Sequence, residues 1–334
     1  MRALVTGGGG FLGQYIIEQL LERGYKVKSF SRHIYPELQK RGVECVTGHI
    51  ESLDDVLRAT QGVEIVFHTA AKVGTFGRYQ DFYRSNVMGT QHLIQACKKR
   101  GIPKLVYTSS SSVTYAGKDK YNADETEPYP TYYYSPYSQT KAMAEKIVLD
   151  ANDGYRFFTV SLRPHLIFGP KDRYIIPRLL DQAKKGKLRM IGEGKNLADI
   201  SYVENVAHAH LLAAERLSPS NPVCGQAYFI TQGEPVNLWH WINRILKEMN
   251  IPEVTSHIPV SLAYGIAWSF EKLYTLLHLS SEPPLTRVVV LQLSTTHYYN
   301  ISKAKKDLGY QPRISTEEGL KKTLEYFTQK YRSA

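Results

Sequence analysis

Ten residues near the start of the chain, LVTGGGGFLG at 4–13, constrain its fold more than any other stretch. Three glycines spaced three residues apart stand between an apolar run at 2–6 and an amphipathic run at 11–23. Because glycine has no Cβ, the backbone can turn tightly there and a pyrophosphate can approach it closely. The first N–H groups of a following helix, at the positive end of its dipole, suit the phosphates. This strand, turn and helix predict a dinucleotide-binding unit, with a spacing of G-x-x-G-x-x-G.

Short apolar strands alternate with helices over the first half of the chain. We expect strands at 2–6, 25–30, 44–47, 64–69, 104–108 and 156–162, and helices at 11–23, 53–59, 86–100 and 136–149. This alternation predicts an α/β fold, a doubly wound parallel sheet (Rossmann fold) covered by helices on both faces.

The pattern becomes irregular after Ile167, although one more strand, at 227–230, is expected to return to the sheet. We therefore expect an NAD(P)-binding Rossmann domain at 1–167 and a smaller, interleaved C-terminal substrate lobe at 168–334.

The end of the second strand predicts which nicotinamide cofactor is bound. An acidic residue there would hold the ribose 2′-hydroxyl of NAD, whereas an arginine accommodates the 2′-phosphate of NADP. The sequence at this point has Ser31 followed by Arg32, and no acid. We therefore expect NADP(H) to be favoured, with NAD(H) as the alternative.

A tyrosine-rich stretch holds the second candidate motif. Ser135 is a suitable N-cap and Pro136 a suitable first helical residue, so a helix is expected to begin here. Of the five tyrosines at 129–137, only Tyr137 has a lysine four residues on, Lys141. On a helix these two side chains share a face, and a nearby positive charge lowers the pKa of a phenol from about 10. The pair is a candidate proton donor and acceptor.

Four more segments follow a known pattern. HTAA (68–71) resembles a strand end whose alanines contact a cofactor, and SNVMGT (85–90) resembles the motif N-V-x-G-T. VYTSSSSV (106–113) resembles the strand end that carries a catalytic serine, and LRPHLIFGP (162–170) resembles the R-P-x-x-I-x-G-P segment beside a nicotinamide. Together with the glycine motif and the Tyr–Lys pair, they make the chain resemble the extended short-chain dehydrogenase/reductase superfamily.

The resemblance implies a complete set of site residues. The catalytic residues are expected to be Ser110, Tyr137 and Lys141, with Ser111 as the rival for the serine. Tyr137 would exchange a proton with the reacting oxygen, Ser110 would donate a hydrogen bond to it, and Lys141 would lower the pKa of Tyr137 and hold the nicotinamide ribose. The residues expected to bind the cofactor are Tyr137 and Lys141 themselves, with Gly7, Gly10, Phe11, Leu12, Gly13, Ser31, Arg32, His49, Ile50, Thr69, Ala70, Ala71, Lys72, Asn86, Thr108, Pro164, Leu166 and Ile167.

One segment departs from the superfamily pattern. Many relatives have Gly-Asp-Ile or Gly-Asp-Leu after the third strand, where the acid meets the adenine amine. This chain has Gly48, His49 and Ile50. We therefore expect no carboxylate hydrogen bond to adenine from this position, and packing of Ile50 on the ring.

Longer segments resemble the 3β-hydroxysteroid dehydrogenase branch. Residues 201–213 and 296–312 are similar to that branch, including its sterol-4-carboxylate 3-dehydrogenases. Residues 70–77 and 186–210 are similar to the bacterial 2-alkyl-3-oxoalkanoate reductases. The resemblance implies hydride transfer between a nicotinamide and a ketone or secondary alcohol of a bulky apolar substrate.

Two other functions use the same scaffold. The sugar dehydratases usually show Thr-Asp-Glu near the fifth strand, which is absent here, and the nucleotide-sugar epimerases usually carry an asparagine where this chain has Pro164 and His165. A non-catalytic NADP-sensing regulator tends to lose the Tyr–Lys pair, which is present. Both remain alternatives to the oxidoreductase.

Composition excludes some partners and leaves others open. Lys and Arg exceed Asp and Glu by 42 to 31, a net charge of +11, but they are spread over the chain rather than gathered in a stripe, so no nucleic-acid partner is expected. The three cysteines are far apart and in no metal-binding spacing, so no metal is expected. The first residues are already a strand, and we expect a cytoplasmic location, with peripheral membrane contact and a homodimer as options.

Two stretches are candidates for the substrate side of the site. The tyrosines before Tyr137, namely Tyr129 and those at 132–134, are expected either to wall the substrate site or to pack on the surface. The apolar stretch at 258–279 is broken by Glu271 and Lys272, which argues against a spanning helix. It is expected to be either a lid over an apolar pocket or a helix lying in a membrane surface.

Overall fold

A seven-stranded sheet forms the centre of the computed structural model, which describes residues 1–279 and 281–332. All its strands pair in parallel. From one edge to the other they are β3 (Glu44–Thr47), β2 (Lys26–Ser31), β1 (Arg2–Thr6), β4 (Ile65–His68), β5 (Lys104–Thr108), β7 (Phe158–Pro164) and β12 (Gln226–Ile230). The expected α/β fold is confirmed.

The strand order reverses between β1 and β4. The chain first builds outward from β1 to β3, then crosses back to add β4, β5 and β7 on the other side. Thr6 and His68, the last residues of β1 and β4, lie side by side in register. Ligands of such sheets bind beyond the carboxyl ends of the strands at this reversal, which is where the candidate site must be sought.

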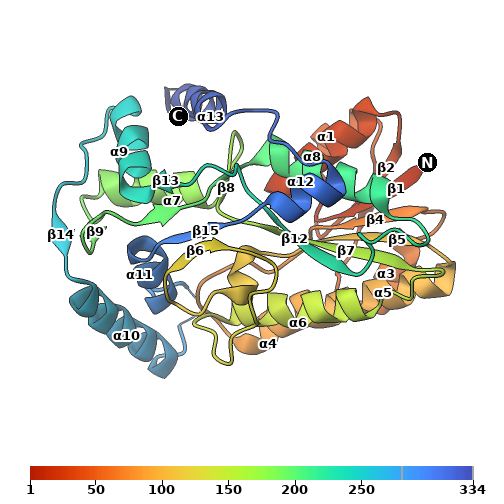
Figure 1. Ribbon diagram of the computed structural model, residues 1–334, viewed down its shortest axis with the longest axis horizontal. Helices are drawn as coiled ribbons and strands as arrows, with labels where there is room; N and C mark the ends of the chain where they lie inside the picture. The colour runs from red at the N-terminus through yellow and green to blue at the C-terminus, as the bar shows by residue number, and fades with distance from the viewer. Residues whose placement is uncertain (280, 333–334) are drawn as a thin grey trace.

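Adjacent side chains of the central strands enter two different cores, because side chains alternate along a strand. Leu4 and Val5 are both fully buried on β1, yet they belong to cores on opposite faces of the sheet. One core includes residues of α1 (Phe11–Glu22), α8 (Val203–Arg216) and α12 (Ser302–Leu308), and the other those of α3 (Leu53–Ala59), α5 (Gly89–Arg100) and α6 (Pro136–Asp150). Figure 1 shows these two helix layers above and below the sheet.

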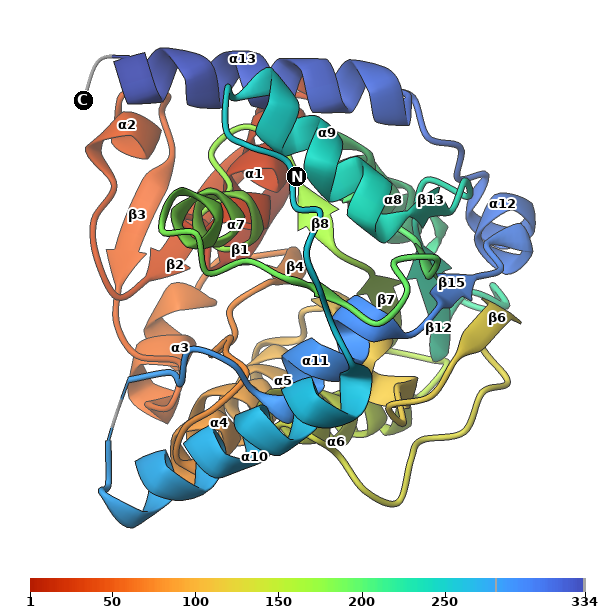
Figure 2. The same ribbon diagram turned by 90° about the vertical axis from the view of Figure 1, so that its left-hand side faces the viewer.

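A third core lies in a lobe at the left of Figure 1. Its helices are α7 (Ile175–Lys184), α9 (Leu238–Glu248), α10 (Val260–Leu276), α11 (Arg287–Ser294) and α13 (Thr316–Arg332). Its strands are β6 (Lys120–Ala123), β8 (Ile167–Phe168), β9 (Met190–Ile191), β10 (Leu197–Ala198), β11 (Ser201–Tyr202), β13 (Val236–Asn237), β14 (His257–Ile258) and β15 (His297–Tyr299). In Figure 2 α13 runs along α9, while α10 and α11 lie at the opposite end of the lobe.

Elements cross the expected boundary at 167–168 in both directions. The strand expected at 227–230 is β12, which pairs with β7 in the main sheet. In the other direction, β6 from the first half pairs with β15 of the lobe. The lobe is therefore interleaved with the sheet, and we propose the division at 167–168 as the end of the continuous half of the Rossmann domain.

One expected helix has a different beginning. The helix expected at 86–100 is α5 preceded by a π-helical turn, Tyr83–Met88, and a short helix α4 (Tyr79–Phe82). The wider π turn carries Asn86, whose side chain is held by two neighbouring segments described below. Such turns often occur at functional sites.

Candidate active site

The glycine turn, residues 7–13, connects β1 to α1 at the strand-order reversal. Gly7 has φ +70°, and a Cβ there would lie 3.0 Å from the backbone of Ala70. A Cβ on Gly13 would lie 2.4 Å from the carbonyl oxygen of Gly7. Gly10 is the N-cap of α1 and offers no side chain to its first N–H groups. The turn has no side chains at these positions, so a pyrophosphate could lie directly against the main-chain N–H groups. The turn therefore fits a pyrophosphate.

The residues expected to select the cofactor end β2 beside this turn. The N–H of Gly9 donates a hydrogen bond to Ser31 Oγ at 3.4 Å. Arg32, the next residue, is exposed. The ring of Tyr35 covers the turn, since a Cβ on Gly9 would lie 1.9 Å from it. A hydroxyl and an exposed guanidinium thus adjoin the glycine turn.

The segment after β3, residues 48–50, is held by a carboxylate of α3. The N–H of His49 donates to Asp55 Oδ2, in the first turn of α3, at 2.9 Å. Ile50 packs against α5, because a Cβ on Gly89 would lie 2.8 Å from Ile50. The imidazole of His49 is exposed and Ile50 is half-buried. Ile50 therefore has a packing role as well as the cofactor contact expected of it.

The loop after β4 is tied to β1 by a buried polar cluster. Thr69 donates its hydroxyl to the carbonyl of Thr6 at 2.7 Å, and the N–H of Ala70 donates to Thr6 Oγ1 at 3.2 Å. His68 lies between two hydroxyls, with Nδ1 2.7 Å from Thr6 Oγ1 and Nε2 3.0 Å from Thr90 Oγ1. Burial lowers the pKa of His68 to about 3, so its ring is neutral. The cluster fixes the strand ends on which the expected alanines stand.

Asn86 connects this loop to α6. Its Oδ1 accepts from the N–H of Lys72 at 2.7 Å, and its Nδ2 donates to the carbonyl of Lys72 at 3.1 Å and to Thr140 Oγ1 at 3.0 Å. Both amide protons are therefore used within the protein. The Asn86 side chain thereby holds loop 69–72 against α6, and the cofactor contact expected of Asn86 stays a prediction.

The start of α6 places the Tyr–Lys pair as expected. Ser135 caps the helix by accepting from the N–H of Ser138 at 3.2 Å, and Pro136 occupies the first turn. Tyr137 and Lys141 follow one helical turn apart. A single N-cap therefore sets where both side chains stand relative to the sheet.

Lys141 is buried at the end of β5. Its Nζ donates to the carbonyl of Thr108 at 2.5 Å and lies 4.0 Å from the ring centroid of Tyr107. Burial lowers the pKa of Lys141 to about 7, and Glu145 one turn on opposes that shift. The side chain of Thr108, expected to contact cofactor, is hydrogen-bonded to Nε2 of His210 at 2.7 Å. Thr108 therefore orients Lys141 through its main chain.

A buried ion pair joins α6 to β7, one helical turn beyond Lys141. Glu145 and Arg163 are bonded at 2.7 Å with side chains 0% and 4% exposed. The carboxylate also accepts from the hydroxyls of Ser161 at 2.6 Å and Tyr129 at 2.7 Å. Burial alone would raise the pKa of Glu145, but Arg163 and these hydrogen bonds outweigh it and the net shift is downward. A permanent negative charge thus faces Lys141.

The serine turn, residues 110–112, follows β5 and separates three neighbouring hydroxyls. The hydroxyl of Ser110 lies beside Tyr137 and lowers the pKa of its phenol. Ser112 supports it, because its N–H donates to Ser110 Oγ at 3.2 Å and its hydroxyl donates to the same atom at 2.9 Å. Ser111 points elsewhere, to Nδ1 of His165 at 2.6 Å, and is 1% exposed. Of the two rival serines, the structure places Ser110 beside Tyr137.

The pKa of Tyr137 differs from expectation. We expected Lys141 to lower it, yet burial raises it to about 12, with the hydrogen bond from Ser110 opposing that shift. The ammonium of Lys141 is directed to the carbonyl of Thr108 instead. Desolvation of the phenol is the largest cause of this shift.

The end of β7 brings the expected nicotinamide segment to the same edge. Pro164 is buried, and Leu166 has the unusual φ of +38°. The carbonyl of Leu166 accepts from the N–H of Ser201, and Ile167 pairs with Ser201 in β8–β11. This strained, doubly held backbone fixes how the segment faces the site.

The tyrosines before Tyr137 do not act as one surface. Tyr129 donates its hydroxyl to Glu145 of the buried ion pair, and Tyr133 donates to the carbonyl of Val113 at 3.2 Å. Tyr134 packs on Gly117, where a Cβ would lie 2.6 Å from its ring, whereas Tyr132 is 55% exposed. The four tyrosines therefore do not share one role, either as a wall of the substrate site or as surface residues.

Several polar residues of this site were not singled out from the sequence. Most lie inside the segments that resemble known motifs, but the resemblance gave them no role: His68, Ser112, Glu145, Arg163, His165 and His297. A signal for the negative charge beside Lys141 was present, since Lys141 and Glu145 have helical spacing.

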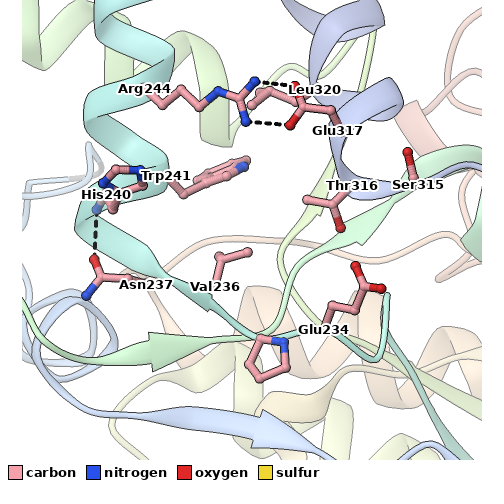
Figure 3. Close-up of a pocket in the computed structure, with 11 residues that line it drawn as sticks. Glu234, Val236, Asn237, His240, Trp241, Arg244, Ser315, Thr316, Glu317 and Leu320 are labelled. Carbon is pink, nitrogen blue, oxygen red and sulfur yellow. Dashed lines mark hydrogen bonds and ion pairs between the residues drawn. The ribbon is translucent and has the colours of Figure 1, made fainter.

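A surface pocket of about 400 Å³ lies away from this edge, between α9 and the start of α13 (Figure 3). Its wall includes Trp241 and the ion pair of Arg244 with Glu317. None of the expected site residues lines it. Within the described part of the chain, no cluster of three or more His, Cys, Asp or Glu side chains could hold a metal ion.

Comparison with known proteins agrees with the geometry. A model of the 3-beta hydroxysteroid dehydrogenase/isomerase family matches residues 4–260. The 2-alkyl-3-oxoalkanoate reductase of Stenotrophomonas maltophilia is 45% identical over 325 residues, covering 96% of this chain and 98% of its own. The mouse decarboxylating sterol-4-alpha-carboxylate 3-dehydrogenase is 40% identical over 330 residues, covering 98% and 91%. In fold, the UDP-glucuronic acid 4-epimerase of Bacillus cereus is similar with a TM-score of 0.76 at 23% identity, covering 99% and 100%.

Proposed function

We propose that this chain, which belongs to the 3-beta hydroxysteroid dehydrogenase/isomerase family, moves a hydride between a nicotinamide and a ketone or secondary alcohol of a bulky apolar substrate. The family and relatives make it an NAD(P)-dependent oxidoreductase of the extended short-chain dehydrogenase/reductase type that acts on a small molecule. The observation that carries the finer proposal is the meeting of Tyr137, Ser110 and Lys141 at the end of β5.

In the direction of reduction, Tyr137 donates its phenolic proton to the substrate oxygen. Ser110 donates a hydrogen bond to the same oxygen, an interaction that strengthens as negative charge develops there. Lys141 holds the nicotinamide ribose, and the hydroxyl of Ser110 opposes the rise that burial causes in the pKa of Tyr137. A bound nicotinamide cofactor supplies or accepts the hydride.

The glycine turn would hold the pyrophosphate of the dinucleotide. NADPH is proposed over NADH because β2 ends in Ser31 and the exposed Arg32, a hydroxyl and a cation suited to a 2′-phosphate. Ile50, loop 69–72 and the end of β7 complete the proposed cofactor site.

The substrate is proposed to be of the 3β-hydroxysteroid or 2-alkyl-3-oxoalkanoate type. Two kinds of support exist, the names of the relatives and the apolar helix α11, whose Leu291 lies with the ring of Tyr134 against Gly117. The nucleotide-sugar epimerases share the fold, and the assay below tests a nucleotide sugar as the alternative substrate.

The test is oxidation of NADPH, followed by absorbance, with purified protein and a panel of 3-ketosteroids, 2-alkyl-3-oxo acids and UDP-sugars. We expect turnover with the first or second class and a lower KM for NADPH than for NADH. Turnover with UDP-sugars alone would refute the proposed substrate class, and tight dinucleotide binding without turnover on any ketone would favour a sensor.

We also propose that α10 makes peripheral contact with a membrane surface. Its inner face buries Ala263 and Ala267, while its outer face exposes apolar side chains, among them Leu262 (56%), Leu273 (47%) and Leu276 (76%). Within the described residues, no helix is long and apolar enough to cross a membrane. Helix α10 also packs on α11 and, through Tyr274, on Phe76, so it serves as a cover for the lobe as well.

Sedimentation with liposomes tests this contact. The double variant Leu273→Glu, Leu276→Glu should abolish co-sedimentation and leave turnover of a soluble substrate intact. Loss of dimer on size-exclusion chromatography, with no effect on liposome binding, would assign the face to a homodimer instead.

A further inference from the structure

Two buried histidines link the serine turn to the lobe. Ser111 Oγ lies 2.6 Å from Nδ1 of His165, Nε2 of His165 lies 2.8 Å from Nδ1 of His297, and Nε2 of His297 lies 2.8 Å from the carbonyl oxygen of Gln292. Ser111, His165 and His297 are 1%, 7% and 1% exposed. The histidine pair, His165 and His297, thus spans from the end of β5, across the end of β7, to β15 and α11.

The far end of this series fixes its direction. Gln292 lies within the last four residues of α11, whose carbonyls lack partners within the helix. The N–H of Thr296, which would continue the helix, donates to Asp119 instead. A carbonyl only accepts, so His297 must carry its proton on Nε2. A second proton, on Nδ1 of His297, would point at Nε2 of His165, 2.8 Å away.

The remaining hydrogen bonds then follow one after another. With Nδ1 of His297 accepting, His165 donates from Nε2 and accepts at Nδ1. Ser111 must therefore donate its single hydroxyl proton to His165. Burial lowers the pKa of both rings, that of His165 most strongly, so both are neutral, as this pattern requires.

The serine turn is consequently held from two sides. Ser111 is drawn inward by the histidine pair, and Ser110, its neighbour, is left facing Tyr137. The oxygen of Ser110 accepts from both the N–H and the hydroxyl of Ser112, which occupies its lone pairs and leaves its own proton to donate outward.

We propose that the histidine pair is a positioning device for Ser110, connecting the lobe helix α11 to the hydroxyl that faces the reacting oxygen. His165 and His297 touch neither Tyr137 nor Lys141 by any hydrogen bond found among the described residues, so they act through the serine turn. A shift of α11 changes the last acceptor of the series and thereby the orientation of the turn. This inference rests on the proposed function, because it assigns Ser110 a role in turnover.

The kinetic test replaces His165 by Leu, alone and in a Ser110→Ala background. We expect His165→Leu to lower kcat roughly ten- to hundredfold, as misplacement of a catalytic group does, and to leave the KM for NADPH unchanged. In the Ser110→Ala background it should lower kcat no further. His165→Asn, which keeps an acceptor near the position of Nδ1, should recover part of the loss.

The matched control is His208→Leu, a histidine on α8 that is 4% exposed and outside the series. It should leave kcat unchanged. An equal loss from His165→Leu with and without Ser110, or a rise in KM with unchanged kcat, would overturn the positioning role.

A second measurement needs no turnover and no variant. With ¹⁵N-labelled histidine, NMR of the wild-type protein should show His165 and His297 as neutral Nε2–H tautomers at neutral pH. An Nδ1–H tautomer or an imidazolium at either position would contradict the series of hydrogen bonds, whatever the substrate proves to be. Correct tautomers together with no turnover on any ketone would instead count against the proposed function alone.

Discussion

The two ends of the proposed dinucleotide site differ in which part of the protein forms them, the main chain or the side chains. At the glycine turn the main chain itself provides the fit, since Gly7 adopts a left-handed conformation and a Cβ on Gly13 would collide with it. At the catalytic end the groups are side chains, and Lys141, Glu145 and Arg163 are all buried. The glycine turn depends on positions that carry no Cβ atom. The catalytic end depends on buried side chains of opposite charge.

This difference predicts different failures on mutation. A change at the glycine turn should weaken binding while the fold survives. A change at the catalytic end should either stop the chemistry or destabilise the protein, because a buried charge left without its partner is costly. Each prediction below tests one side of this contrast.

The largest effect is expected from Tyr137→Phe. It removes the phenolic proton and keeps the ring, so turnover should fall roughly 10²- to 10⁴-fold while NADPH binding, measured by fluorescence, persists. Tyr132→Phe is the control, because Tyr132 is 55% exposed on the preceding loop. If Tyr137→Phe keeps full turnover, the proposed mechanism is wrong.

Glu145→Gln should be the most destabilising of these changes. It leaves the guanidinium of Arg163 buried without its countercharge, which costs about 3–5 kcal/mol in the free energy of unfolding. Urea denaturation measures this. In the control Glu193→Gln, the lost partner is the exposed Lys195, and no measurable change is expected. Equal stability of both variants would show that burial of the ion pair has little energetic weight.

Gly13→Ala should affect binding more than folding. The added Cβ would lie 2.4 Å from the carbonyl of Gly7, so the turn must shift, and we expect NADPH affinity to drop at least about tenfold. Gly265→Ala on α10 has open space around it and should stabilise the helix by about 0.5–1 kcal/mol. Calorimetry that finds unchanged NADPH affinity in Gly13→Ala would count against the pyrophosphate site.

Arg32→Ala should sharpen the cofactor assignment. Loss of the guanidinium should weaken NADPH binding about tenfold, equivalent to ~1.4 kcal/mol, with little change for NADH. Lys26→Ala, at the other end of β2, removes the same charge away from the turn and serves as the control. Parallel losses for both cofactors in Arg32→Ala would argue against a 2′-phosphate contact.

The smallest effect concerns the pH dependence of stability. The pKa of Lys141 is about 7 in the folded protein, against 10.5 for an ordinary lysine. Between these values the unfolded chain binds the proton and the folded chain does not, so this residue makes the free energy of unfolding rise with pH. Lys141→Met should flatten that rise by about 1 kcal/mol over one pH unit. Lys146→Met, exposed on the same helix, should leave the slope as in the wild type.

The sequence predicted those parts of the site that one local segment determines. The glycine spacing, the N-cap at Ser135 and the four-residue step from Tyr137 to Lys141 each lie within one strand, turn or helix. Their geometry follows from backbone conformations that are the same in any fold. The resemblance to known motifs then placed these segments together, and the family assignment is confirmed.

Other parts could not be predicted because they depend on contacts across the chain. The sequence did not predict that the amide of Asn86 bonds to Lys72 and Thr140. The pKa of Tyr137 was expected to fall, but burial raises it to about 12. Burial and competition for hydrogen bonds both depend on all the residues that surround a side chain. A local sequence pattern does not specify those residues.

The sequence by itself thus determined the doubly wound sheet, the glycine turn and the identity of the candidate proton donor. Only the tertiary structure decided which of the adjacent serines faces that donor, since His165 and His297, 54 and 186 residues beyond Ser111, draw one of them away. The physical reason is that a backbone turn is set by its own residues, whereas the direction of a hydroxyl is set by whichever donors and acceptors the fold brings within about 3 Å of it.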